Sequence, residues 1–151
     1  MVLDNWNSAI ARTSKLIGEL TDEQLEAECA PGRNTGKYLL GHLTAVHDRM
    51  LPLLGLGKQE YAHLNDAFLA SPDKSGKEMP TVADLRHYWH DTNMRLDNLF
   101  GNLTAEDWFA RHMSVSEEDF EKEPHRNRLN VILSRTGHLT EHLGQMLYLK
   151  K

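Results

Sequence analysis

The sequence predicts an all-α fold, a four-helix bundle with a long loop between its second and third helices. Four long segments place apolar residues at the three- and four-residue spacing of an amphipathic helix, and no segment alternates as a half-buried strand does. The 151 residues show no internal repeat and suffice for a single domain, residues 1–151, with one hydrophobic core. Helices of this kind bury their apolar faces most simply against one another.

The N-terminal part of the chain predicts one long helix and one short helical turn. The long helix is expected over roughly residues 5–18, and its apolar side consists of Trp6, Ile10, Leu16 and Ile17. Thr21 and Gln24 have the capping-box form T-x-x-Q, which predicts the start of a short helical turn. Pro31 and Gly32 then interrupt helical structure.

The second long helix is expected to begin near Asn34 or Thr35 and to carry "YLLGHLTAVHDRMLPLL" as far as Gly55 and Gly57. Proline lacks a backbone N–H and clashes with the preceding turn, so Pro52 should bend or end the last turn. The apolar centre of this helix consists of Leu39, Leu43, Val46, Met50 and Leu54.

Residues 55–80 form the longest irregular connection, in which glycine and proline recur. A loop of this length in a small domain indicates a functional segment or a lid. The third long helix should open at Thr81, with Asp84 three residues later as a weaker capping box, and run to about Phe100. Its core-facing side consists of Val82, Leu85, Trp89, Leu96 and Leu99.

The C-terminal third predicts a short helix near residues 104–109 and then the last long helix. The long helix is expected to start around Pro124, because proline suits the first helical position, and to continue to Leu149. Its apolar residues are Leu129, Ile132, Leu139, Leu143 and Met146.

Charge and composition exclude several function classes. A net charge of -5 and a pI near 6.0 argue against binding to nucleic acid or to an anionic membrane surface, which requires clustered Lys and Arg. Cys29 is the single cysteine, so neither a disulfide framework nor a cysteine-rich zinc site is expected. No signal-peptide pattern and no run of about 18 apolar residues occurs, and we therefore expect a cytoplasmic protein.

The nine histidines direct attention to metal or proton chemistry. In "RTGHLTEHLGQMLYL", His138 and His142 are spaced i, i+4, which places their Cβ atoms about 6 Å apart on one helix face. Two partly exposed polar residues would explain this pair equally well, so a third ligand must decide. The candidates on the helix beginning near residue 35 are His42 and His47, which lie about 140° apart around it. Periodicity slightly favours His47 but leaves the choice open.

Two segments carry a family resemblance. "APGRNTGKYLLGHLTAVHDRMLPLLGLG" and "EPHRNRLNVILSRTGHLTEHLGQM" resemble the DinB-like, or DinB/YfiT, superfamily of four-helix-bundle proteins. The family pattern is a histidine in an LxHL-like stretch, then HxxxH on the last helix and Gln three residues later. Here it falls on His42, His138, His142 and Gln145. The resemblance implies that the three histidines bind one divalent metal, and it selects His42 over His47 as the third ligand.

Three neutral imidazoles with open positions are typical of a catalytic rather than a structural metal site. These ligands do not decide among Zn, Ni, Fe, Co, Cu and Mn. His47 and Gln145 are candidates to support the ligands, and Glu141 or Asp48 could orient an imidazole N–H, although a solvated helix face is the commoner role of such carboxylates. Cys29 has no neighbours that would lower its pKa, and we do not expect it to be a nucleophile.

The favoured function is a metal-dependent enzyme of the thiol S-transferase or hydrolase type that acts on a small-molecule substrate. The resemblance implies a low-molecular-weight thiol as cosubstrate, and it also implies a homodimer. The alternative function is a non-catalytic, stress-related bundle that binds a metal or ligand. A structural dimerisation domain with incidental histidines is the third interpretation.

Overall fold

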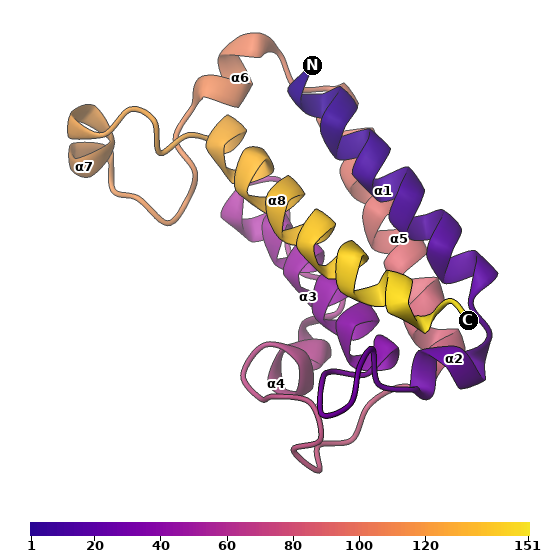
Figure 1. Cartoon of the computed structure of the whole chain (residues 1–151). Coiled ribbons are helices and arrows are strands. Elements are labelled where there is room, and N and C mark those ends of the chain that lie inside the picture. The colour runs from indigo at the N-terminus through magenta and orange to yellow at the C-terminus, as the bar shows by residue number, and fades with distance from the viewer.

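Four long helices make up most of the molecule (Figure 1): α1 (Val2–Glu19), α3 (Gly36–Leu53), α5 (Val82–Gly101) and α8 (Arg128–Met146). The computed structural model describes residues 1–151 and contains no strand, only two isolated bridges, so the predicted all-α class is confirmed. None of the helices combines the length and the apolar composition that a membrane crossing requires.

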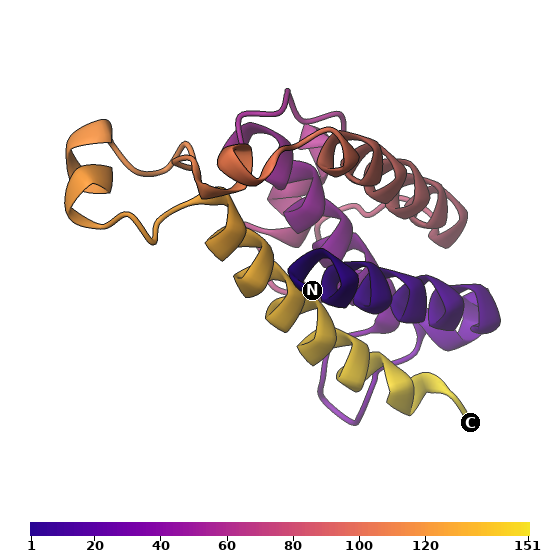
Figure 2. The same cartoon turned by 90° about the horizontal axis from the view of Figure 1, so that it is seen from above.

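The four long helices share one core of 30 buried apolar residues. α3 packs along α5 and α1 packs along α8, whereas α3 and α8 touch over a shorter stretch. Figure 2 shows α8 crossing α3 at an angle. Side chains of both helices, including Arg49 and Arg135, line a groove between them. The candidate site lies in this groove.

Helix starts are where the sequence pattern and the structure agree best. Thr35 and Thr81 cap α3 and α5 as predicted, each by accepting the backbone N–H of the residue three positions later. Thr21 forms the predicted capping box with Gln24 at α2 (Asp22–Glu26). Thr104 forms another at α6 (Ala105–Phe109), where the short helix was predicted. A cap depends on residues within one turn and can therefore be predicted locally.

The start of the last helix differs from the prediction. α8 begins at Arg128, not near Pro124, because the Asn127 side chain accepts the backbone N–H of Asn130 and caps the helix there. The helix also ends earlier than expected, at Met146, and a 3-10 turn, η2 (Leu147–Leu149), follows it. Asn is among the strongest capping residues, and it outweighs a proline that only tolerates a helix start.

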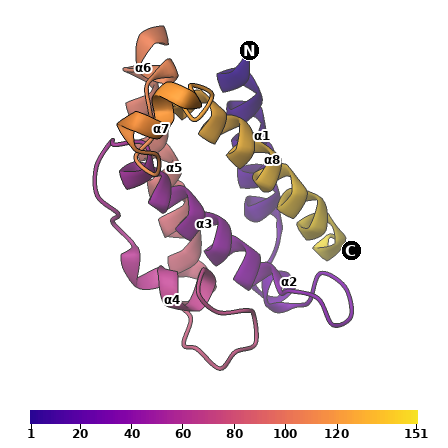
Figure 3. The same ribbon diagram turned by 90° about the vertical axis from the view of Figure 1, so that its left-hand side faces the viewer.

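Two further segments are helical where an irregular chain was expected. α7 (Glu117–Lys122) extends away from the other helices (Figures 1 and 2) and is capped by Ser116. In Figure 3, which is seen from that side, α7 lies in front of α5. The loop after α3 contains a 3-10 turn, η1 (Ala62–Leu64), and α4 (Asn65–Phe68). For α7 the sequence does carry a signal, since Ser116 and Asp119 have the spacing of an N-cap and its third helical residue.

Asp48 holds the segment after α3 against the rest of the molecule. Its carboxylate is fully buried and accepts hydrogen bonds from the backbone N–H groups of Glu60 and Tyr61 and from the Gln59 amide. The sequence-based expectation of a solvated helix face is therefore wrong for Asp48. A buried carboxylate is stable here because it satisfies the N–H groups of a turn that has no helix to pair with.

Candidate metal centre

Three histidine rings from α3 and α8 meet in the groove between these helices. The Nε2 atom of His138 lies 3.1 Å from Nε2 of His42 and 3.1 Å from Nε2 of His142. The potential ligand atoms of the three residues all lie within 4.8 Å of one another, and each residue is partly buried. The i, i+4 pair on α8 thus meets one ring of α3, as expected for a site built on facing helices.

The far nitrogens of two rings determine their tautomers. Nδ1 of His42 lies 2.8 Å from the carbonyl oxygen of Phe68, and Nδ1 of His142 lies 2.9 Å from Oε1 of Gln145. A carbonyl or amide oxygen only accepts, so each Nδ1 carries the proton and donates. The Nε2 atoms of His42 and His142 consequently present lone pairs to the centre of the cluster.

A positive charge between these lone pairs would satisfy all of them at once. A proton on Nε2 of His138 can satisfy one of its two neighbours at 3.1 Å but not both. A divalent cation would accept all three lone pairs. Two imidazole nitrogens at about 2.0–2.1 Å from one zinc ion are about 3.3 Å apart at the tetrahedral angle, close to the separations observed here. The three residues therefore fit a metal ion.

Burial favours the neutral form of His138 and His42. It lowers the pKa of His138 to about 4, and the neighbouring His142 and His42 lower it further in the same direction. Burial also lowers the pKa of His42, against the hydrogen bond to Phe68, which raises it. Metal ligation needs the unprotonated ring, so both shifts favour the ligating form at neutral pH.

His47 lies outside this cluster. Its ring is fully buried between Trp6 and Trp89, at centroid distances of 4.9 Å and 5.2 Å, and its Nδ1–H donates to Oδ1 of Asn93 at 2.9 Å. Its Nε2 atom has no partner. Burial lowers the pKa of His47 to about 3, so the ring is neutral in the folded protein. His47 therefore occupies the aromatic core between α1, α3 and α5.

We expect His47 to make folding stability depend on pH. Below its ordinary pKa of 6.5 the unfolded chain protonates this ring, whereas the folded chain does so only near pH 3. The unfolded state thus binds more protons in this window, so stability is complete above pH 6.5 and falls with pH. From pH 7 to 5 the loss from this residue should be about 2 kcal/mol.

Chemical denaturation of the metal-free protein across this range measures the effect. His47→Gln should show a shallower pH dependence than the wild type, and His90→Gln, which changes an exposed histidine on α5, should leave the slope unchanged. Equal slopes for His47→Gln and the wild type would contradict the assignment.

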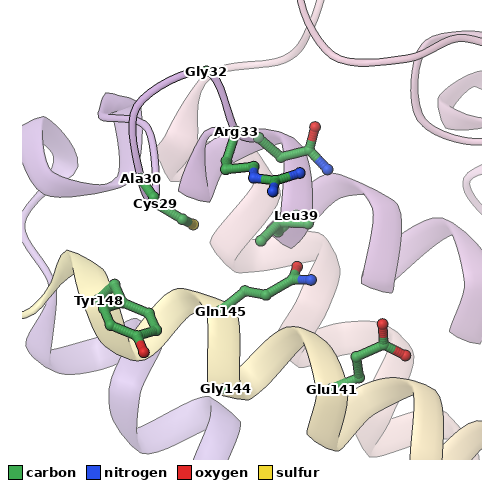
Figure 4. A pocket seen from close by; sticks show the side chains of 10 residues that line it. Cys29, Ala30, Gly32, Arg33, Leu39, Glu141, Gly144, Gln145 and Tyr148 are labelled. Carbon is green, nitrogen blue, oxygen red and sulfur yellow. The ribbon is translucent and has the colours of Figure 1, made fainter.

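A cavity of about 640 Å³ adjoins the histidine cluster near the C-terminal end of α8. Gln145, which bonds His142, lines it together with Glu141, Tyr148 and most of the segment 29–34 (Figure 4). Cys29 also lines it, but burial and the Asp73 carboxylate raise the pKa of this thiol, which keeps it protonated. Glu141 is exposed and bonds none of the three histidines. The volume is in the range of small-molecule sites.

Sequence reasoning did not identify two groups that position the histidines. The Phe68 carbonyl belongs to α4, so no side chain signals its role. Tyr38 stacks on His42 at a centroid distance of 6.1 Å and donates its hydroxyl to the carbonyl of Ser71. It lies one turn before His42, but an aromatic residue at that spacing is equally typical of a core.

Comparison with known proteins assigns the chain to a family. A family model described as the DinB superfamily matches residues 5–146, which cover most of α1, all of α3, α5 and α8, and the three clustered histidines. The comparison with curated proteins returns no match. Because the family model spans most of the chain, the protein belongs to the DinB superfamily.

Proposed function

We propose that this protein is a metal-dependent enzyme that binds one divalent transition metal through His42, His138 and His142. It acts on a small-molecule substrate by activating a water molecule or a low-molecular-weight thiol, in a hydrolase or thiol S-transferase reaction. In this proposal residues 1–151 form the four-helix bundle of the superfamily as a single domain, and the protein works in the reducing cytoplasm, where thiols are available.

One observation carries the proposal: three Nε2 atoms converge while hydrogen bonds occupy Nδ1 of His42 and of His142. Incidental surface histidines would not share this arrangement. The Phe68 carbonyl and the Gln145 amide hold two of the rings in the tautomer that ligation requires.

Three ligands leave positions for solvent or substrate. A bound divalent cation supplies Lewis acidity, which lowers the pKa of water or of a thiol that occupies an open position. The surrounding residues contribute neutral imidazoles and no carboxylate, so the positive charge of the cation is retained in full. An anionic fourth ligand is favoured for that reason.

The test is to load the untagged protein with Co²⁺ and to record its visible spectrum. Adding a low-molecular-weight thiol such as glutathione or cysteine should shift the ligand-field bands and bring in a sulfur-to-cobalt charge-transfer band. The serine and S-methyl analogues of these thiols cannot form a thiolate, so they serve as controls and should bring in no such band. If no thiol perturbs the spectrum and the site is closed to water, the non-catalytic binding module replaces the enzyme as the preferred function.

We also propose a homodimer. Phe109 on α6 and Leu133 on α8 are 60% and 50% exposed. Both side chains are apolar, and burying them against a second copy of the chain would be favourable. Sedimentation velocity should then give a mass near twice 17.3 kDa. Leu133→Glu should shift the measured mass toward that of the monomer. Leu129→Glu is unsuitable for this test, because Leu129 packs on the core. A monomer at high protein concentration would count against the dimer.

A further inference from the structure

A second cavity, of about 390 Å³, lies in the same groove on the other side of the histidine cluster. On α3, Val46 lines it one turn after His42, and on α8, Arg135 lines it one turn before His138. Leu69, the residue after the Phe68 whose carbonyl bonds His42, lines it as well. A helical turn rises about 5.4 Å, so the cavity begins within one turn of the proposed metal position.

Arginines supply all the charge in this cavity. Arg49 and Arg135 line it from α3 and α8, and the other lining residues include no Asp or Glu. Arg49 lies seven residues after His42, and Arg135 lies seven residues before His142, so on each helix the arginine shares the histidine face. The groove therefore carries three histidines at one end and two guanidinium groups at the other.

Neither of these two arginines forms an ion pair with any carboxylate of the chain. Nε of Arg135 is buried without a partner. Five other arginines bond a carboxylate or a backbone carbonyl: Arg86, Arg95, Arg111, Arg126 and Arg128. Arg12 and Arg33 also lack such a partner, but both are exposed and lie outside this cavity. Arg135 is partly buried, and a guanidinium there without a partner, beside the second cation Arg49, is unfavourable.

The energetic consequence is visible at Arg135. Burial lowers the pKa of this guanidinium from its ordinary value, and the charge of Arg49 lowers it further. A guanidinium presents its donors as a planar fork that matches the two oxygens of a carboxylate or phosphate, so an oxyanion would relieve both effects. Val46, Leu53, Leu69 and Met113 make much of the remaining wall apolar.

We infer that Arg49 and Arg135 form a subsite for the oxyanion group, a carboxylate or a phosphate, of the small molecule on which this protein acts. The inference rests on the proposed function in one respect: the reactive end of that molecule lies at the histidine cluster. One to two helical turns, about 5 to 11 Å, separate the two ends. A small, partly apolar anion spans that distance.

Inorganic phosphate and acetate are the probes, each titrated into the full chain at constant ionic strength adjusted with chloride. Binding is followed by NMR line broadening of the phosphorus and methyl signals, in zinc-loaded protein and in chelator-treated protein. We expect saturable binding in both forms, and the tighter of the two anions identifies the group that the subsite prefers. Absence of saturable binding of both anions to the wild type overturns the inference.

Variants test whether the arginines are responsible. Arg49→Gln and Arg135→Gln should each weaken binding about tenfold or more, because each removes charge-assisted hydrogen bonds. Arg12→Gln is the matched control, since it removes one positive charge from α1, outside the cavity, and should leave the affinity unchanged. Arg49 is exposed, so Arg49→Gln remains informative even if Arg135→Gln fails to fold. Unchanged affinity in Arg49→Gln overturns the inference.

Cobalt tests the link between the subsite and the histidine cluster. In Co²⁺-loaded protein the phosphorus relaxation of bound phosphate should be faster than in Zn²⁺-loaded protein, because a paramagnetic ion acts over the distance of one or two turns. Equal relaxation rates would place the anion elsewhere and overturn the inference. Phosphate binding by the metal-free chain does not depend on a metal site, so it separates failure of this subsite from failure of the proposed function.

Discussion

Replacing His138 by alanine is expected to reduce the metal content of the purified protein from one ion per chain to almost none. Nε2 of His138 lies 3.1 Å from each of the other two Nε2 atoms, so its loss removes the centre of the cluster. Loss of a supporting residue alone typically weakens metal binding 10- to 100-fold, and loss of a ligand should cost at least about 100-fold. His42→Ala and His142→Ala should have comparable effects.

Metal content is measured by mass spectrometry on untagged protein, because an affinity tag would itself bind metal. His90→Ala is the control, since it changes an exposed histidine on α5. His47→Ala tests the rival that periodicity favoured. Unchanged metal stoichiometry in all three cluster variants would refute the proposed site. Loss of metal in His47→Ala but not in His42→Ala would identify His47 as the third ligand.

Gly41→Ala is expected to destabilise the fold by about 1–3 kcal/mol or more. A Cβ atom at this position would lie less than 3.0 Å from the ring of Phe68, which is fully buried and cannot move aside. The clash must push α4 away from α3. Because α4 carries the carbonyl that orients His42, metal affinity should fall as well, by about tenfold.

The control for this variant is Gly137→Ala on α8, where an added Cβ would meet nothing within 4 Å. Alanine in a helix interior is favoured over glycine by about 0.5–1 kcal/mol, so this variant should be neutral or more stable. Denaturant unfolding gives both stabilities, and a metal titration gives both affinities. A Gly41→Ala protein with wild-type stability and metal affinity would show that α4 does not press on α3 as described.

Local patterns in the sequence predicted most of the secondary structure. Thr35 and Thr81 cap their helices through residues three positions away, and the apolar spacing of each long helix is a property of that helix alone. The errors arose where two local signals competed, as Pro124 and Asn127 did before α8. They also arose where a short helix is stabilised by its cap rather than by an apolar face, as in α7.

Within the candidate site, the pair on α8 could be predicted from its spacing, because residues at i, i+4 share a helix face wherever the helix packs. The environment of the other histidines depends on how the helices pack against one another. His42 and His47 both point into the molecule from α3, but His42 faces α8 and His47 faces Trp6 and Trp89 on α1 and α5. Periodicity measures how far a residue lies from the centre of an apolar face. It does not identify which neighbouring helix covers each side, since that depends on contacts between residues far apart in the chain. The Phe68 carbonyl and the opposing arginines of α3 and α8 become visible only in the folded structure for the same reason.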